Sequence, residues 1–541
     1  MERGATILSI IFSVIMLAGL VFILDCTGIC EVGITDCARK NEKHEFYYEE
    51  VKEENEEIIG YCLKEIRYSF NEMGKVVVPS EHNGKPVIGI KEGVFYHIVS
   101  LKEVVLPDQI KEIGASAFAE TALERINLPK GLERIEERAF AGTALKNITI
   151  PDSVTYLAKD AFEDTNIEEY EKGVYYVDNW VIGYDEELTD VELREETVGI
   201  ASWVFGEDIM YTPQIKNVVL NDELRCISEN AFNNCEFLTI QLPETLEYIG
   251  SFAFYDCKLI NVVIPEDVIY IGDSAFENCV SITGNIIISE NIKYLGQEAF
   301  RNCSSINSVV LPETVRSIAY GLFYNCLNLS SISGTENLKS IGAWALGNCK
   351  TLTDIELADN VELGKGAFSG CGFTSFEYPV GCNVVPASCF SECASLVTIE
   401  VHDGITEIGK SAFKNCTNLT SIEIPLKVEI ISENMFEGCT GLFEVILSEK
   451  IKTIGEYSFY NCKLLTSITF PSRVDLIYKG AFQGSGLQSV IFDNNYGWFF
   501  CDSVDSDTGT KISANEMEDS TRASEIFISK MNSKYFKRSA K

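Results

Sequence analysis

The stretch from Cys393 to Phe413 reads CASLVTIEVHDGITEIGKSAF, and the stretch from Cys416 to Phe436 reads CTNLTSIEIPLKVEIISENMF. The second repeats the first almost residue for residue. The general pattern is C-x-x-L-x-x-I-x-[ILV]-P, a variable link, and I-x-x-x-x-x-A-F-x-x-C, which leads into the next copy. A unit this short cannot bury its own apolar face, so its copies stack on one another. The pattern therefore predicts a repeat solenoid.

Copies of the unit fill most of the chain. The residue before the final x-x-C recurs at steps of 22 to 24, apart from the two steps on either side of Phe205. It is Phe95, Phe118, Phe140, Phe162, Phe205, Phe232, Phe254, Phe276, Phe300, Phe323, Leu346, Phe368, Phe390, Phe413, Phe436, Phe459 and Phe482. This regularity predicts about 17 coils of 22–24 residues.

Each coil contains a segment that alternates polar and apolar side chains, as in Ser421 to Ile424. A period of two is typical of a strand with one buried face. Proline often follows, as at Pro425, and ends the strand because it cannot donate a ladder hydrogen bond. The later I-x-x-I-G predicts a second extended piece and a turn. We therefore expect a β-rich solenoid with a parallel sheet along one face, roughly 80 Å long at about 4.8 Å per coil.

The repeated unit resembles the BspA-like branch of the leucine-rich repeat superfamily, whose unit looks like LTSITIPxSVTxIGxxAFxxC. The likeness covers roughly residues 86 to 492. Residues 163–204, with Asn179-Trp180-Val181-Ile182-Gly183, look like the hairpin that many bacterial members insert. The resemblance implies a surface or secreted protein, since some members are implicated in binding host proteins and other cells.

The predicted organisation has five parts. They are a signal or membrane anchor (1–24), an acidic stalk (25–60), an entry or cap segment (61–94), the leucine-rich repeat array (95–492, with the insertion at about 163–204) and a C-terminal module (493–541).

The N-terminal part carries a compartment signal. From Ala5 to Leu24 the chain has twenty residues without a charge, which is long enough for a helix to cross a membrane. Arg3 precedes this run and acidic residues follow it, which favours export of the rest of the chain. An uncleaved anchor places the protein on the cell surface, and signal cleavage, the alternative, leads to secretion.

Charge and composition exclude some function classes. A formal net charge of -37 repels nucleic acid, so we expect no nucleic acid partner. The chain has four histidines, scattered along the sequence, and no nucleotide-binding glycine loop, HExxH or GxSxG motif. We therefore expect a protein that is not an enzyme, with no catalytic residues and no cofactor.

Cysteine recurs in the repeat at one position. The ladder consists of Cys235, Cys257, Cys279, Cys303, Cys326, Cys349, Cys371, Cys393, Cys416, Cys439 and Cys462. We interpret it as a packing ladder of small, reduced, inward thiols. The other eight cysteines are Cys26, Cys30, Cys37, Cys62, Cys226, Cys382, Cys389 and Cys501, and their pairing stays open.

The candidate binding residues form an acidic column. Repeat alignment places Glu356, Glu377, Glu400 and Glu423 at one outward position of four successive coils, with Asp354 and Glu444 beside them. Carboxylates about 5 Å apart repel one another. Splayed side chains and salt relieve that repulsion in the simplest interpretation. The alternatives are a basic partner surface or a bound Ca²⁺ ion.

The function that these observations favour is adhesion-like binding of a macromolecular partner, a protein or a polysaccharide. The first alternative is a passive spacer or envelope component. The second is a surface enzyme with its site in the insertion or the C-terminal module. Self-association also stays open.

Overall fold

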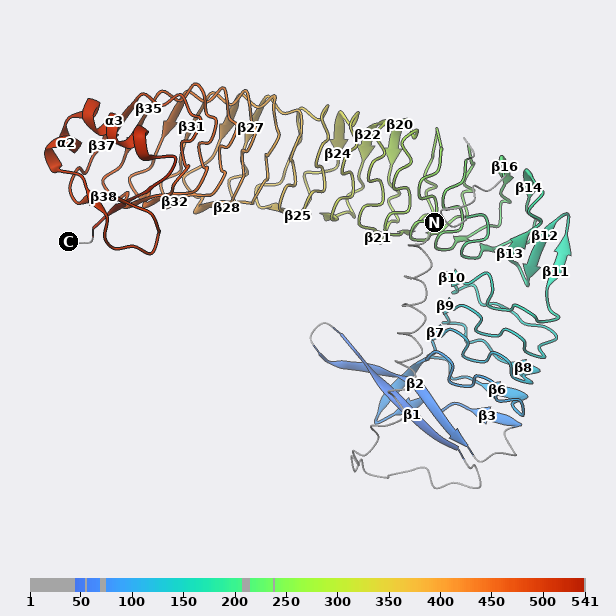
Figure 1. Cartoon of the computed structure of the whole chain (residues 1–541). Coiled ribbons are helices and arrows are strands. Elements are labelled where there is room, and N and C mark those ends of the chain that lie inside the picture. The colour runs from blue at the N-terminus through green and yellow to red at the C-terminus, as the bar shows by residue number, and fades with distance from the viewer. Residues whose placement is uncertain (1–43, 54–55, 69–73, 207–214, 237–238, 540–541) are drawn as a thin grey trace, which may run out of the picture. The chain divides into compact units, whose positions relative to one another are not determined.

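The computed structural model describes residues 44–53, 56–68, 74–206, 215–236 and 239–539 (Figure 1). The chain divides into two units, residues 1–45 and 46–541, and the second contains the repeat array. It is a β-solenoid in which each coil lies on the next, so the predicted fold class is confirmed.

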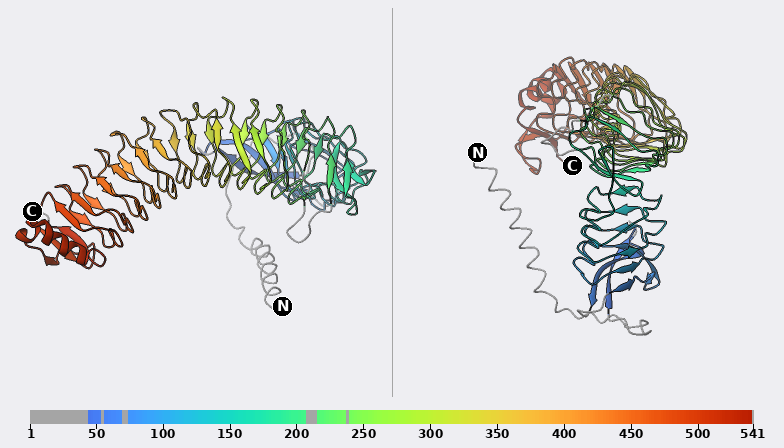
Figure 2. Two further views of the ribbon diagram at one scale, coloured as in Figure 1. Left: turned by 90° about the horizontal axis from the view of Figure 1, so that it is seen from above. Right: turned by 90° about the vertical axis from the view of Figure 1, so that its right-hand side faces the viewer.

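In most coils the alternating segment forms a strand of a parallel ladder, named ladder A, which consists of several short sheets (Figure 2). Its buried central residues, such as Ile399 and Ile422, enter the core. The strands are β3 (Lys75–Val77), β6 (Glu103–Val105), β8 (Arg125–Ile126), β14 (Asp190–Glu192), β16 (Asn217–Val219), β20 (Gly284–Ile287), β22 (Ile306–Val310), β24 (Ser331–Ser333), β27 (Ser375–Glu377), β29 (Thr398–Glu400), β31 (Ser421–Glu423), β33 (Glu444–Ile446), β35 (Ser467–Phe470) and β37 (Ser489–Phe492).

The I-x-x-I-G piece of each coil forms a second parallel ladder, named ladder B, where the sequence predicts only an extended piece. The strands are β5 (Lys85–Ile90), β7 (Glu112–Ile113), β9 (Arg134–Ile135), β10 (Tyr156–Leu157), β13 (Trp180–Tyr184), β15 (Gly199–Ile200), β17 (Cys226–Ile227), β18 (Tyr248–Ile249), β19 (Tyr270–Ile271), β21 (Tyr294–Leu295), β23 (Ser317–Ile318), β25 (Ser340–Ile341), β26 (Glu362–Leu363), β28 (Val384–Val385), β30 (Glu407–Ile408), β32 (Ile430–Ile431), β34 (Thr453–Ile454) and β36 (Leu476–Ile477).

The glycine of I-x-x-I-G is required by the close approach of neighbouring coils. A Cβ built on Gly272 would lie 2.4 Å from the backbone nitrogen of Ser251, and one on Gly250 would lie 2.5 Å from that of Glu229. Any larger residue would push the coils apart at this corner, so the motif fixes where ladder B turns.

The phenylalanines stack on one another through the core. Phe118 and Phe140 lie with ring centroids 5.3 Å apart and planes 7° apart, and Phe390 and Phe413 repeat this arrangement at 5.9 Å. These rings are fully buried. Face-to-face rings at this spacing match the distance between coils, so one aromatic position per coil sets the stacking geometry.

The ladder cysteines are buried beside this stack and are free thiols. Each thiol donates a hydrogen bond to the backbone carbonyl oxygen of the stacked residue of an earlier coil. Cys279 Sγ, for example, lies 2.9 Å from the Phe254 oxygen. Among the other cysteines, Cys62, Cys226, Cys382, Cys389 and Cys501 are also free, and Cys26, Cys30 and Cys37 lie outside the described residues.

The insertion contains an antiparallel hairpin, β11 (Glu169–Glu171) with β12 (Val174–Val177), and β12 pairs in turn with β13. Strand β13 pairs with β15 and so takes the place in ladder B next to it. The coil before the insertion also contacts the coil after it: Cys226 Sγ donates to the Thr155 oxygen at 3.2 Å. The hairpin thus interrupts ladder B without separating the two parts of the array.

The N-terminal part of this unit differs from the prediction. The acidic stalk is expected to extend to residue 60, yet β1 (His44–Lys52) and the start of β2 (Ile58–Tyr68) lie within it. Strand β2 pairs with β5 and extends ladder B, and β4 (Glu81–His82) pairs with β5 on the same end. These residues therefore build the first layer over the core, with Leu63 and Ile66 of β2 buried in it.

No helix in the described part of the chain is long and apolar enough to span a membrane. The predicted anchor at residues 1–24 and most of the predicted stalk lie outside the described residues.

The C-terminal module closes the other end. Helices α2 (Ala514–Glu518) and α3 (Ser520–Lys530) precede β40 (Tyr535–Arg538), which pairs antiparallel with β36 and with β38 (Trp498–Cys501). Strand β39 (Thr510–Lys511) completes the edge. Phe527 of α3 packs on Phe482, the last ring of the stack. The module therefore covers the end of the core.

Candidate functional site

The central part of the acidic column lies on ladder A as the repeat alignment predicts. Glu377 ends β27 and Glu400 ends β29, and the two are register partners. Glu423 occupies the corresponding end of β31. All three side chains are exposed. Neighbouring strands of a sheet are about 4.8 Å apart, so Glu377 and Glu400 present two carboxylates side by side.

The column ends after Glu423. The register pairs Ser421 with Glu444 and Glu423 with Ile446. Glu444 therefore lies at the neighbouring outward position, and an exposed isoleucine continues the column. The sequence alignment gives the same offset, so Glu444 flanks the column.

At the other end of the column, the strand that the sequence predicts does not form. Asp354 and Glu356 are exposed, but residues 352–358 form no strand. Strand β24 pairs only with β22, and β27 pairs only with β29. Within the described chain, none of the backbone N–H groups of residues 354–357 donates a hydrogen bond. Ladder A is therefore broken here, between β24 and β27, as it also is at other places along the array.

The cause lies in the next coil, where aromatic residues replace aliphatic ones. The usual C-x-x-L-x-x-I-x-I becomes C-x-F-x-x-F-x-Y, with one residue deleted, so that Phe373, Phe376 and Tyr378 fill the three inward positions. The rings of Phe373 and Phe376 lie 5.1 Å apart, with their planes inclined at 61° to each other. This packing needs more room between coils than leucine and isoleucine do, and it holds residues 353–358 away from β27.

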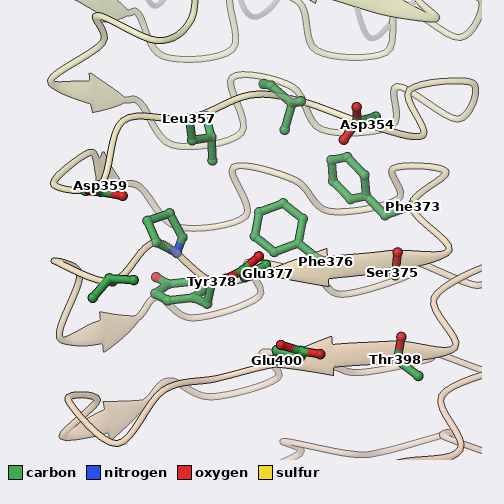
Figure 3. Close-up of a pocket in the computed structure, with 13 residues that line it drawn as sticks. Asp354, Leu357, Asp359, Phe373, Ser375, Phe376, Glu377, Tyr378, Thr398 and Glu400 are labelled. Carbon is green, nitrogen blue, oxygen red and sulfur yellow. The ribbon is translucent and has the colours of Figure 1, made fainter.

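An open cleft of about 530 Å³ results, between residues 354–359 and strands β27 and β29 (Figure 3). Its lining combines apolar and acidic side chains: Asp354, Ile355, Leu357, Asp359, Phe373, Ser375, Phe376, Glu377, Tyr378, Pro379, Val380, Thr398 and Glu400. Figure 3 shows the Phe373 and Phe376 rings between the two chain segments, with Asp354 and Glu377 beside them.

The carboxylates at this cleft differ from several acids of the later coils in having no ion-pair partner among the described residues. Lys410 pairs with Glu433 at 2.8 Å, and Lys452 pairs with Glu429 at 2.7 Å. By contrast, no described residue forms an ion pair with Asp354, Asp359, Glu377 or Glu400. The cleft therefore carries four negative charges that solvent alone compensates.

The described residues contain no group of three His, Cys, Asp or Glu side chains that could hold a metal ion. Of the six predicted binding residues, Glu377, Glu400 and Glu423 form a row along the coils, and Glu444 lies beside it. Ca²⁺ takes six to eight oxygen ligands, which a single row of carboxylates does not supply by itself.

A column of exposed apolar side chains precedes the acids on ladder A, and sequence reasoning missed it. Val263, Ile287 and Val310 are 76%, 61% and 40% exposed. Ile287 and Val310 are register partners, and Val310 pairs with Ser333. The outward position that carries glutamate in the later coils thus carries valine or isoleucine in the earlier ones. The signal was present in the repeat alignment, where these residues occupy a position that is polar elsewhere.

Comparison with known families decides the identity of the repeat. A model described as "BspA type Leucine rich repeat region (6 copies)" matches residues 73–182, 205–285, 271–396 and 383–499. Together these ranges cover well over half of the chain. The chain belongs to the BspA type leucine rich repeat family. The predicted resemblance is thereby confirmed. No curated protein matches the chain.

Several solved structures are similar to this BspA type chain. A leucine-rich repeat protein from Bacteroides ovatus is 20% identical, with 81% of this chain and 95% of that one covered and a TM-score of 0.43. A leucine rich cell surface protein from Faecalibacterium prausnitzii is 22% identical, with 77% and 96% covered and a TM-score of 0.24. The pneumococcal vaccine antigen PcpA is 20% identical, with 54% and 74% covered and a TM-score of 0.21. These likenesses do not bear on what this chain binds.

Proposed function

We propose that this protein is exported, is held at the cell surface by its N-terminal segment, and binds a macromolecular partner there through the outward face of ladder A. A protein or a polysaccharide fits the length of that face better than a small molecule. No catalytic step is part of the proposal. Membership in the BspA type family supports a binding or adhesion role, because this repeat builds long exposed surfaces.

The observation that carries the proposal is the composition of ladder A. Along one outward position, apolar side chains (Val263, Ile287, Val310) are followed by carboxylates (Glu377, Glu400) with no ion-pair partner among the described residues. Exposed apolar and unpaired acidic side chains in register cost solubility and electrostatic energy. A partner that covers the apolar part and places cations on the acidic part would relieve both.

The proposal is tested with cells that produce the full chain. Protease treatment of intact cells first shows whether the chain is outside. Purified matrix proteins, glycans and bacterial surfaces are then tested for binding to these cells and to cells without the chain. Saturable binding that is lost in Ile287→Asp and Val310→Asp variants, with the chain still exposed, is the expected result. An exposed chain that binds none of them would favour the passive spacer.

A further inference from the structure

The cleft at the break in ladder A combines three kinds of chemistry within one opening. Its rim is acidic, with Asp354 and Asp359 on one side and Glu377 and Glu400 on the other. Its walls include the half-buried side chains of Ile355 and Leu357. Residues 353–358 also leave backbone groups without a partner in the described chain, since of their carbonyls only those of Glu356 and Ala358 accept hydrogen bonds, from Thr335 and Val361.

A ligand group that is complementary to this cleft needs a positive charge, several hydrogen-bond donors and an apolar stem. A metal ion lacks the stem, and a neutral sugar lacks the charge. The guanidinium of arginine is planar, always charged and carries five N–H donors. Its aliphatic stem packs on apolar side chains while the charged end stays at the rim. The lysine ammonium has charge and stem, but only three donors on a compact head.

We propose that the cleft between residues 353–358 and β27 docks a basic segment of a partner protein, with an arginine side chain of that segment inserted between Glu377 and the Ile355–Leu357 wall. This deepens the proposed function and rests on it, because it names the chemistry of the macromolecular partner. Further basic residues of the segment lie along Glu400 and Glu423, one coil apart.

The volume and position of the cleft favour a protein segment over an isolated ion. About 530 Å³ exceeds what one side chain fills, so residues on either side of the arginine enter as well. The cleft also opens directly onto the acidic column, so a segment that leaves it can follow the carboxylates across β27, β29 and β31. The break in ladder A therefore lies next to the first carboxylates of the row that the bound segment follows.

The experiment uses the full chain in an uncharged detergent and measures the affinity of blocked hexa-arginine and hexa-lysine peptides at 0.15 M salt, an ionic strength that screens distant charges. The site variant is Glu377→Gln with Glu400→Gln. The matched control is Glu362→Gln with Glu407→Gln, two exposed carboxylates of ladder B, which changes the net charge equally. A further variant, Phe376→Ile, restores the usual aliphatic residue without altering charge.

We expect the site variant to weaken hexa-arginine binding at least tenfold and the control to leave it within twofold. Phe376→Ile, checked for folding by protection of its buried thiols, also weakens binding, and wild type prefers hexa-arginine to hexa-lysine. Equal weakening in site and control variants, or no preference between the peptides, would show that the peptides are attracted only by the net charge of the chain. Either result would overturn the proposed docking of arginine in the cleft. Neither result affects the cell-binding test, since a partner that binds elsewhere on ladder A would still be captured. Conversely, a cleft that behaves as expected on a chain that binds no macromolecule would overturn the proposed function alone.

Discussion

The thiol of Cys326 donates a hydrogen bond to the backbone carbonyl oxygen of Phe300, with 3.2 Å between Sγ and the oxygen. All eleven ladder cysteines make this contact, at 2.9 to 3.4 Å, to Phe205, Phe232, Phe254, Phe276, Phe300, Phe323, Leu346, Phe368, Phe390, Phe413 and Phe436. The ladder therefore does more than fill space: it gives each of these buried carbonyls a donor from the next coil, which for Phe300 adds to the backbone N–H of Cys303.

Replacing Cys326 with alanine should destabilise the chain by about 1–3 kcal/mol, because the Phe300 carbonyl loses one of its two donors and a small cavity forms. A serine hydroxyl at this position can donate to the same carbonyl, so Cys326→Ser should cost less than Cys326→Ala. Urea unfolding of both variants measures the order, and an alanine variant as stable as wild type would refute a role for the S–H donor.

The ladder thiols should resist alkylation in the folded chain. Burial raises the pKa of Cys349, Cys393 and Cys462 to about 12, and the reactive thiolate is then scarce at neutral pH. Cys382 is half-buried and should be labelled first. Mass spectrometry after brief iodoacetamide treatment, before and after unfolding, measures this. Labelling of the ladder as fast as of Cys382 would mean that the coils open readily.

Glu229 should make the stability of the array depend on pH. It is half-buried beside the insertion, and burial raises the pKa of its carboxyl, with the nearby Arg134 opposing the rise. Because the pKa of Glu229 is higher in the folded chain, the contribution of this carboxyl to stability is fully present below the unfolded pKa, about 4.3 for glutamate. That contribution is lost as the pH rises through the folded pKa. Glu229→Gln should therefore be more stable than wild type at pH 7.

The advantage of Glu229→Gln should shrink and vanish as the pH falls below about 4, where wild type is protonated as well. Urea midpoints at several pH values measure this difference. Glu196→Gln, an exposed change of the same charge, serves as the control and should show no such pattern. A constant difference between Glu229→Gln and wild type at all pH values would contradict the assignment to this carboxyl.

Much of the fold follows from the sequence because the repeat fixes it. Phe118 stacks on Phe140 for the same reason that their sequence contexts match, and Glu377 lies opposite Glu400 because both end equivalent strands. The repeat predicts poorly the structure of those coils that depart from its consensus sequence. The deletion before Phe373 is visible in the sequence, but its consequence depends on how three aromatic rings share the space of three aliphatic side chains.

Strand β2 and ladder B show a second reason why strands are missed in the sequence. The charged run that ends before Gly60 looks patternless, since few of its residues are apolar, yet Leu63 and Ile66 further along are buried and draw β2 onto the first coil. Ladder B strands are mostly two residues long, as at Ile271, which is too short for periodicity to separate a strand from a turn. Their pairing becomes evident only when coils are stacked.

The acidic column should respond to cations as a row of screened charges. Two carboxylates 5 Å apart repel by about 0.8 kcal/mol at the permittivity of water, so Glu377→Gln should stabilise the chain by up to about 1 kcal/mol at low salt. The gain should shrink at 1 M salt, where screening removes most of the repulsion. Because Glu377 has only Glu400 as a register partner, no cage of six to eight oxygens forms. We therefore expect Ca²⁺ and Mg²⁺ to raise the melting temperature of wild type equally at constant ionic strength. A larger rise with Ca²⁺ that disappears in Glu377→Gln with Glu400→Gln would instead establish a calcium site on the column.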